Sequence, residues 1–580
     1  MLACYAMAKK RTVENEDLSM FRNHFFITSL LLGIMLSGGN AIAAEAEKTD
    51  ARFELSKNLD VYNSILKTLN IYYVDSIHPQ KLIRTSIDGM LASLDPYTNY
   101  IPQEEQSEFK LQMSGEYGGI GAIISQHFRD TTRKTYDIVI SEPYEGMPAH
   151  KAGLQAGDII KSIDGKKTDG MTVTNVSELL RGVPGTSVSV VVERPGTGPV
   201  KRTLLRQKIH IDPVTWYGMV DPQTGYILLN QFTENSADHI KNAIIELKGK
   251  GMKQLVLDLR NNPGGLLDQA VNILSFFVKK EEKVLFTRGK TKQMDEDYRT
   301  SSDPIEPNLP LAVLINGASA SASEIVSGAI QDLDRGIVVG TRSYGKGLVQ
   351  STRPLPYDGS LKLTIAKYYT PSGRCIQAID YAHRNEDGSL SRIPDSLTSV
   401  FHTRAGREVR DGGGITPDVE VKNEHNLNIA DELYARNCIF DFATVYVQHN
   451  KHIAEPSQFS ISDKDWTEFK KFVMDKGFSY HLKTSDALRH LKELAKYEGY
   501  DQRAKEEFDA LERKLAVNVE ADLEQNRQDI LDYLNTEIIQ RYYFQKGPVQ
   551  YTLQKDPVLK KALEILNDKQ QYNALLRTEK

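Results

Sequence analysis

The sequence predicts a multidomain α/β protein, in which a layered α/β core follows a smaller glycine-rich β domain and helical regions lie at both ends. Three observations support this fold class. The 580 residues exceed what one hydrophobic core usually serves. Apolar residues recur at helical spacing near both ends of the chain. Between residues 226 and 317, strand-like apolar runs alternate with amphipathic ones, which is typical of a sheet with parallel pairing.

Residues 1–44 are expected to be an export signal rather than part of the fold. A positive charge precedes an apolar stretch at 25–36, and small residues lead to Ala43 and Ala44. This order is typical of a signal peptide, and about 12 apolar residues are few for a bilayer span. We expect cleavage near Ala43 or Ala44, an extra segment at 1–19, and a location in the bacterial periplasm or cell envelope. An uncleaved membrane anchor is the alternative.

The composition excludes several other classes of protein. The chain has 72 Lys and Arg against 77 Asp and Glu, so its charge gives no reason to expect nucleic acid as a partner. Only Cys375 and Cys438 would remain after cleavage, and no CxxC or His/Cys cluster occurs. Two cysteines make neither a disulfide framework nor a zinc site. We therefore expect no metal and no other cofactor.

Helical regions are expected at both ends of the chain. In region 45–110, apolar side chains repeat every three to four positions, as around Leu66. Region 425–580 shows the same spacing, as around Trp466. Neither region offers residues with evident chemistry. Packing or self-association is the expected role, and a homo-oligomer through these helices is one expectation.

Region 111–208 has a different pattern. A glycine-rich stretch at 117–124 is followed by GLQAGDIIKSIDG at 153–165 and then by an alternating strand around Val190. Together, these residues resemble a PDZ domain. The first stretch taken alone would fit an ordinary glycine-rich turn between strands equally well.

The resemblance to PDZ domains implies a peptide-binding loop. In that family, a loop of alternating glycine and apolar residues presents backbone N–H groups to the terminal carboxylate of a peptide, and the following strand pairs with the peptide. The matching residues here are Gly119, Ile120, Gly121 and Ala122.

Region 209–424, together with part of the N-terminal region, is expected to form the α/β core. Its apolar runs predict buried strands, and the amphipathic runs between them predict helices. The predicted strands are 226–232, 254–260 and 311–317, and the predicted helices are 236–248 and 266–277. Polar segments at 281–310 and 380–412 are expected to be loops or insertions.

Ser321 is a candidate nucleophile because of its place in the chain. A buried strand is predicted to end at Gly317 and a helix to begin near Ala322, so this serine lies at a strand-to-helix turn. Such a turn exposes a hydroxyl beside free backbone N–H groups, which can bind an oxyanion. A serine there is also an ordinary helix N-cap, the commoner interpretation for an isolated serine.

Lys346, in YGKG at 344–347, is a candidate base. A lysine with the usual pKa of about 10.4 is protonated at neutral pH, so its pKa must fall by roughly 3 through burial away from carboxylates. If a strand continues after it, Gln350 lies an even number of positions away and faces the same side. The amide oxygen of Gln350 can then orient the amine.

Two other sites are compatible with parts of this pattern. Residues 340–347 nearly spell a phosphate-binding loop, but Gly347 stands where magnesium requires Ser or Thr. Arg342 and Tyr344 are also bulky for the middle of such a loop. A Ser-His-Asp triad does not depend on sequence order, and His239 is the nearest upstream histidine. A solvated helical histidine is the commoner state of such a residue.

The spacing of the serine and the lysine is similar to that in the carboxy-terminal-processing peptidases, also called tail-specific proteases. In that family, the serine of S-A-S-E precedes the lysine of G-K-G by 25 positions, as Ser321 precedes Lys346. Further stretches that resemble the family are SLDPYTNY (93–100), LDLRNNPGG (257–265), LTIAKYYTPSGRCIQ (363–377) and GGGITPD (412–418). The resemblance covers about residues 55–425 and implies a ClpP/crotonase-like layered α/β protease core with an inserted PDZ domain.

The same resemblance implies roles for individual residues. Ser321 would be the nucleophile, Lys346 the general base and Gln350 the residue that positions the lysine. The backbone N–H groups of Gly265 and Ala322 would form the oxyanion hole. The neighbouring alternatives are Gly264, Ser319 and Ser323.

The expected protein is thus an exported serine endopeptidase that processes or degrades exported proteins. It would bind protein or peptide substrates by flexible C-terminal tails through the PDZ domain, and an adaptor protein is left open. The alternative is a catalytically silent PDZ scaffold that only binds peptides. Such a scaffold should have lost the nucleophile, the base or the glycine turn, and all three are present.

Overall fold

The computed structural model describes residues 52–577, except 130–134, 386, 388 and 423–427. The predicted export signal lies outside the described residues. The chain divides into two compact units, one that ends at Ser93 and one that begins at Leu94. Among the described residues, no helix is both long enough and apolar enough to cross a bilayer.

The described part of the first unit consists of two helices. Residues 52–72 form the first, and α2 (Pro79–Ala92) is the second. Their apolar side chains face mostly solvent, since Phe53 and Ile71 are 65% and 67% exposed whereas Leu91 is buried. The helical spacing predicted for this region is therefore present, but it does not produce a buried core within the unit.

A six-stranded sheet forms the centre of the second unit, in the order β10-β11-β12-β15-β16-β21. The pair β10 and β11 is antiparallel, and every other neighbouring pair is parallel. The strands are β10 (Val214–Met219), β11 (Thr224–Leu229), β12 (Gln254–Asp258), β15 (Leu311–Ile315), β16 (Ile337–Gly340) and β21 (Val419–Glu420). The predicted layered α/β core with partly parallel pairing is confirmed.

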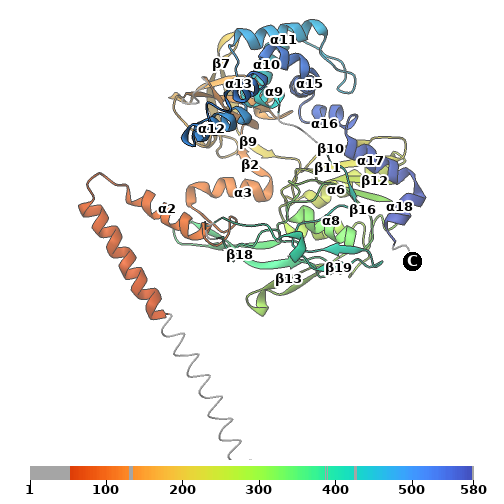
Figure 1. Cartoon of the computed structure of the whole chain (residues 1–580). Coiled ribbons are helices and arrows are strands. Elements are labelled where there is room, and N and C mark those ends of the chain that lie inside the picture. The colour runs from red at the N-terminus through yellow and green to blue at the C-terminus, as the bar shows by residue number, and fades with distance from the viewer. Residues whose placement is uncertain (1–51, 130–134, 386, 388, 423–427, 578–580) are drawn as a thin grey trace, which may run out of the picture. The chain divides into compact units, whose positions relative to one another are not determined.

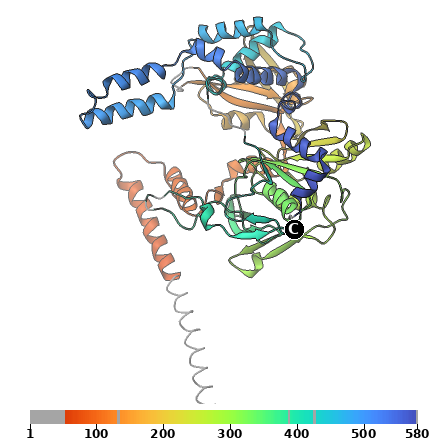
Figure 2. The same cartoon turned by 45° about the vertical axis from the view of Figure 1, so that its right-hand side comes forward.

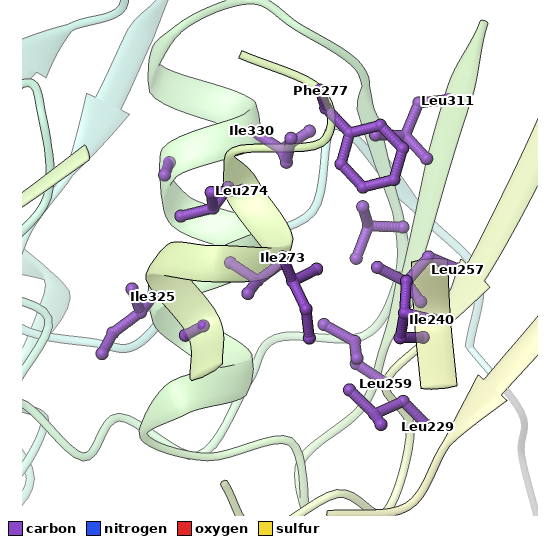
Figure 3. Close-up of a cluster of buried hydrophobic side chains, with 14 of the residues drawn as sticks. Leu229, Ile240, Leu257, Leu259, Ile273, Leu274, Phe277, Leu311, Ile325 and Ile330 are labelled. Atoms are coloured by element: carbon purple, nitrogen blue, oxygen red, sulfur yellow. The ribbon is translucent and has the colours of Figure 1, made fainter. Parts of the chain in front are cut away.

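Helices cover both faces of this sheet (Figure 1). Figure 3 shows one face, where Ile240, Ile273 and Ile330 from three helices gather beside Leu257 of β12. The next residue along the strand, Val256, faces the opposite way and packs against the last helices of the chain. The helices on the first face are α6 (Ser236–Gly249), α7 (Leu267–Leu274) and α8 (Ala322–Asp332), and those on the second are α17 (Pro557–Asn567) and α18 (Lys569–Leu575).

A second sheet has the order β1-β18-β13-β14, with β17 paired to β18. Its members are β1 (Asn99–Ile101), β13 (Lys283–Gly289), β14 (Glu296–Arg299), β17 (Leu348–Pro354) and β18 (Ser360–Tyr369). Two short 3-10 helices, η2 (Lys292–Met294) and η3 (Asp395–Leu397), lie in the connecting segments. β13 and β14 form a hairpin within 281–310, and β19 (Val400–His402) pairs with β20 (Glu408–Arg410) within 380–412. The prediction of loops was wrong for these hairpins, because their strands are short or mix polar with apolar side chains, which conceals the strand pattern.

The glycine-rich domain is a β domain with its own core around Ile140, Leu154 and Val190. Its main sheet has the order β3-β4-β5-β7-β8, β6 pairs with β5, and β2 pairs with β9. Its elements are β2 (Glu116–Gly119), β3 (Ala122–Phe128), β4 (Tyr136–Pro143), α4 (Pro148–Lys151), β5 (Ile159–Ile163), β6 (Lys166–Lys167), α5 (Val173–Leu180), β7 (Ser187–Arg194), β8 (Gly198–Leu205) and β9 (Gln207–His210). The short η1 (Gln103–Glu105) and α3 (Gln106–Ser114) precede it.

The C-terminal region is helical, as predicted, and has a core around Phe442, Phe469 and Leu534. Its helices are α9 (Ile429–Ala435), α10 (Cys438–His449), α11 (Asp463–Asp475), α12 (Lys483–Tyr497), α13 (Lys505–Lys514), α14 (Val519–Gln525), α15 (Arg527–Tyr543) and α16 (Lys546–Leu553). In Figure 2, the light-blue helices α12 and α13 run side by side. Because α17 and α18 cover the central sheet instead, the end of this region belongs to the α/β core.

Candidate active site

Ser321 lies between β15 and α8, at the strand-to-helix turn that the sequence predicted. Its backbone has φ 56° and ψ −113°, and a positive φ is rare for a residue other than glycine. The hydroxyl makes no side-chain cap hydrogen bond, since the Glu324 N–H donates to the Ser321 carbonyl oxygen instead. Strained backbone beneath an uncommitted hydroxyl is typical of a nucleophile turn.

The two neighbouring serines have hydroxyls that are already engaged. Ser319 and Ser323 are fully buried. The Ser319 hydroxyl donates to the Leu259 carbonyl at 2.8 Å, and the Ser323 hydroxyl donates to the Asn262 carbonyl at 2.9 Å. These two serines therefore fix the turn, while Ser321, which is partly exposed, is left for other contacts.

The NPGG loop packs against this turn. A Cβ atom added to Gly264 would lie 2.7 Å from Ser321 Cβ and 2.9 Å from the Ala322 nitrogen. The Gly264 N–H donates to Asn262 Oδ1 at 2.8 Å. Within the described part of the chain, the N–H groups of Gly265 and Ala322 donate no hydrogen bond. Ala322 therefore has an unused donor at the serine turn, and Gly265 has one directly after the glycine that packs against that turn; an oxyanion hole requires two such donors.

A buried carboxylate, that of Glu324, joins the serine turn to the lysine loop. Its Oε2 accepts hydrogen bonds from the N–H groups of Ser321 at 2.8 Å and Lys346 at 2.9 Å. Its Oε1 accepts from the Gly345 N–H at 2.7 Å and from the Ser343 hydroxyl at 2.5 Å. Burial raises the pKa of Glu324 to about 7.

The buried phenol of Tyr368 provides a second connection. Its hydroxyl lies 3.2 Å from the Ser321 carbonyl oxygen and also contacts the Lys346 carbonyl oxygen. The structure therefore brings together two residues that the sequence paired by spacing alone. Sequence reasoning missed both connecting side chains. The S-x-x-E pattern of a capping box could have indicated Glu324, whereas no local signal indicates Tyr368.

The Lys346 amine is partly buried and lies over an aromatic ring. Its Nζ is 4.4 Å from the ring centroid of Tyr97. Burial, and next the charge of Lys362, lower the pKa of Lys346 to about 8. In the described residues, the amine makes no hydrogen bond to the Ser321 hydroxyl. Hydrogen bonds between catalytic groups often form only in the complex with substrate, so the lack of this bond here is compatible with a dyad.

Gln350 does not contact the Lys346 amine within the residues that the structure describes. Its Nε2 donates to the Leu348 carbonyl at 3.2 Å and to the Thr364 hydroxyl at 3.3 Å. Lys346 precedes the first residue of β17, Leu348. Strand alternation, on which the sequence argument relied, therefore does not govern the direction of the Lys346 side chain.

The predicted peptide-binding loop joins β2 to β3. Gly119 pairs with Gln207, and the Ile120 side chain is buried in the domain core. The N–H groups of Ile120 and Gly121 donate no hydrogen bond to any described residue. A cavity of about 1060 Å³ opens beside the loop, with Ile120, Ala122 and parts of β3 and α5 in its lining.

The alternative sites find no support in the geometry. His239 lies 2.9 Å from an Asp212 oxygen and stacks on His210, which accounts for its contacts without Ser321. In the loop at 340–347, N–H groups that could cradle a phosphate are bound to Glu324 instead. Among the described residues, no group of three or more His, Cys, Asp or Glu could hold a metal ion.

The chain matches known families over three regions. Residues 223–382 match peptidase family S41, residues 139–194 match the PDZ domain, and residues 429–566 match "Probable PDZ-protease, C-terminal helical domain". These ranges fall on the α/β core, the β domain and the C-terminal helices described above.

The similar proteins include proteases from several sources. A "Carboxy-terminal-processing protease" of Bartonella bacilliformis is 38% identical over 352 residues, which are 60% of this chain and 79% of that protein. A "Probable CtpA-like serine protease" of Staphylococcus haemolyticus is 35% identical over 369 residues, 61% of this chain and 71% of that protein. The solved photosystem II D1 C-terminal processing protease is 28% identical and covers 62% of this chain and 92% of its own, with a TM-score of 0.34.

Proposed function

The chain belongs to the carboxy-terminal-processing proteases, serine peptidases of family S41 with a PDZ domain, and we propose that it is an exported endopeptidase with a Ser321/Lys346 dyad. One arrangement carries this proposal. An uncapped serine with positive φ precedes the unused N–H of Ala322 and packs against the NPGG loop, and Glu324 and Tyr368 connect that turn to the lysine loop. The substrates are exported proteins that the PDZ domain captures by their C-terminal tails.

The proposed reaction proceeds through an acyl-enzyme. The neutral Lys346 amine takes the proton of the Ser321 hydroxyl, and the serine oxygen attacks the carbonyl carbon of the scissile bond. The oxyanion accepts hydrogen bonds from the N–H groups of Gly265 and Ala322. The C–N bond then breaks, and the lysine ammonium returns its proton to the leaving amine. Water attacks the ester with the same lysine as base, and the serine is regenerated.

The lowered pKa of Lys346 supports its role as base. With a pKa of about 8, roughly a tenth of the lysines are neutral at pH 7, against fewer than one in a thousand at the usual value. In this proposal, the amine turns from Tyr97 toward the serine when substrate binds. Gln350, whose Oε1 has no partner in the described structure, then accepts a hydrogen bond from the amine and orients it.

Tail capture is proposed from the geometry of the PDZ domain. The unused N–H groups of Ile120 and Gly121, in the loop that Gly119 and Ala122 flank, would bind the terminal carboxylate. Strand β3 lies at the end of its sheet, so a peptide can pair along its outer edge. Unfolded or flexible tails would be preferred, because pairing requires an extended strand.

The export signal at 1–44 remains a proposal from the sequence. So does self-association through the first unit, which the exposed apolar side chains of its helices support. No feature of the site favours the silent scaffold, since the serine, the lysine and the glycine turn are all present.

Cleavage of an unfolded protein by purified variants tests the proposed site. Ser321→Ala and Lys346→Ala should each lower kcat by about 10⁴-fold or more, since removal of a nucleophile or base leaves only residual catalysis. Ser302→Ala, at an exposed serine away from the nucleophile turn, is the control for the serine and should retain most activity. Equal cleavage by all variants would refute the dyad. Binding without turnover by the wild type would support the scaffold instead.

A further inference from the structure

Arg260 connects the last helices of the chain to the loop beside the nucleophile turn. It follows β12, and its guanidinium group lies between two carboxylates. An oxygen of Asp258 accepts a hydrogen bond from Arg260 Nε at 2.9 Å, and Asp556 Oδ2 accepts one from Arg260 Nη2 at 2.5 Å. The side chains of Asp258, Arg260 and Asp556 are only 2%, 19% and 11% exposed. They form a largely buried charged cluster, in which hydrogen bonds between ionised groups are strong.

Asp556 uses its two carboxylate oxygens for different contacts. Oδ1 accepts hydrogen bonds from the N–H groups of Val558 and Leu559 and so caps helix α17, whereas Oδ2 contacts Arg260. Helix α17 lies beside β12 on the second face of the central sheet (Figure 1). Asn or Ser caps a helix about as well as Asp does. The negative charge of Asp556 is therefore explained by Arg260 and not by the helix.

From this cluster, the contacts continue through the NPGG loop to the nucleophile turn. The Asn262 carbonyl oxygen accepts hydrogen bonds from the Ala320 N–H at 3.0 Å and from the Ser323 hydroxyl at 2.9 Å. Ala320 and Ser323 lie on either side of Ser321. Asn262 Oδ1 also accepts from the N–H of Gly264, the glycine that packs against the serine. A shift of this loop would therefore move the surroundings of the serine.

We propose that Asp556 is a positioning residue for catalysis, which fixes the oxyanion-hole loop through Arg260. This role rests on the proposed function, in which the N–H groups of Gly265 and Ala322 bind the oxyanion. Such donors are effective because they do not reorganise during the reaction, so a loosened loop weakens binding of the transition state more than binding of the substrate. Asp556 belongs to the region that matches the C-terminal helical domain. That region thereby contributes to the reaction in the α/β core.

Steady-state kinetics of the purified full chain test this role. Asp556→Asn and Asp556→Ser both keep a helix N-cap and remove the charge that contacts Arg260. The substrate is a quenched-fluorescent peptide that the wild type cleaves. In both variants, kcat should fall by about three- to tenfold while KM stays within about twofold, because the oxyanion donors are displaced and not removed.

Inhibition by a peptide boronate gives a readout that a purely structural role would not change. The Ser321 oxygen adds to the boron, and the tetrahedral adduct places an oxygen in the oxyanion hole, as the transition state does. The inhibition constant should therefore rise in both Asp556 variants by the factor by which kcat/KM falls. A partly unfolded preparation would lower the apparent kcat but leave the inhibition constant unchanged.

Asp568→Asn is the matched control. Asp568 caps the neighbouring helix α18 by accepting the N–H groups of Gln570 and Gln571, and it forms no salt bridge with any described residue. The substitution removes the same charge from the same kind of cap. Both kcat and the inhibition constant should remain those of the wild type.

The outcomes distinguish this inference from the proposed function. Wild-type kcat in both Asp556 variants, or a lower kcat with an unchanged inhibition constant, would overturn the role of Asp556. An equal loss in Asp568→Asn would also overturn it, because capping alone would then account for the effect. Full activity of Ser321→Ala would refute the proposed site itself, whatever Asp556 does.

Discussion

The serine half and the lysine half of the site are held in different ways. The Ser321 turn is fixed through its backbone, because Glu324 accepts its N–H and Gly264 packs against its Cβ atom. The Lys346 backbone is bound by the same Glu324, yet its amine makes no hydrogen bond in the described structure and rests on the Tyr97 ring. The chain thus positions the nucleophile by direct bonds and the base by its surroundings.

This difference follows from what each group must do. The oxyanion hole must not reorganise during the reaction, so a rigid turn favours catalysis. The lysine must change its charge twice in each cycle. A strong acceptor on its amine would stabilise the ammonium and raise its pKa, whereas burial and a neighbouring cation lower it. A loosely held amine is therefore consistent with a base that works near neutral pH.

The largest effect is expected where the two halves meet. Glu324→Gln replaces one acceptor oxygen with an amide NH₂ group, which would face two hydrogen-bond donors. We expect a loss of about 2–4 kcal/mol in the free energy of unfolding, because buried donors lose a charged acceptor. We also expect kcat to fall about 10²-fold, since small displacements of reacting groups have such effects. Denaturant unfolding and cleavage kinetics measure the two quantities.

Glu142→Gln is the matched control, since Glu142 is also a buried glutamate but contacts Gln540 and Gln545 of the C-terminal helices. It should leave kcat within about twofold of the wild type, as expected for a site remote from the reaction. Wild-type kcat in Glu324→Gln would mean that the turn and the lysine loop are fixed independently.

The same contrast explains what could be predicted from the sequence. Strands such as β12 and β15 are short apolar runs and were predicted, as was the turn at Ser321, because local patterns encode them. Tyr368 was not predicted, because it reaches its carbonyls from 47 and 22 positions away. Long-range contacts of this kind leave no periodic signal. The packing of α17 on the central sheet escaped prediction for the same reason.

The pH dependence of the wild type tests whether the environment sets the base. Because Lys346 must be unprotonated to act, kcat/KM should rise with pH and level off above a pKa of about 8. This corresponds to an increase of about tenfold between pH 7 and pH 9. If the rise of kcat/KM were instead centred near pH 6.5, the usual pKa of histidine, it would support a histidine base such as His239.

A smaller effect is expected at the second connection between the halves. Tyr368→Phe removes the hydroxyl that contacts the Ser321 and Lys346 carbonyls. The free energy of unfolding should fall by about 1 kcal/mol, and kcat should fall by about fivefold with KM unchanged if the hydroxyl aligns the dyad. Tyr369→Phe is the control, since that ring stacks on Phe286. A rise in KM with constant kcat would place Tyr368 in substrate binding.

The smallest effect is expected beneath the lysine amine. Tyr97→Leu removes the aromatic face that favours the ammonium but keeps an apolar side chain there. A cation–π attraction of about 0.5–1 kcal/mol corresponds to roughly 0.4–0.7 pH units, so the acidic limb should move to lower pH by that amount. Tyr97→Phe keeps the ring face and loses only the hydroxyl that contacts Tyr344 and Tyr381. The pH dependence of kcat/KM should therefore stay that of the wild type in this variant. A limb that moves to higher pH in Tyr97→Leu would mean that the ring acts chiefly by excluding water from the amine.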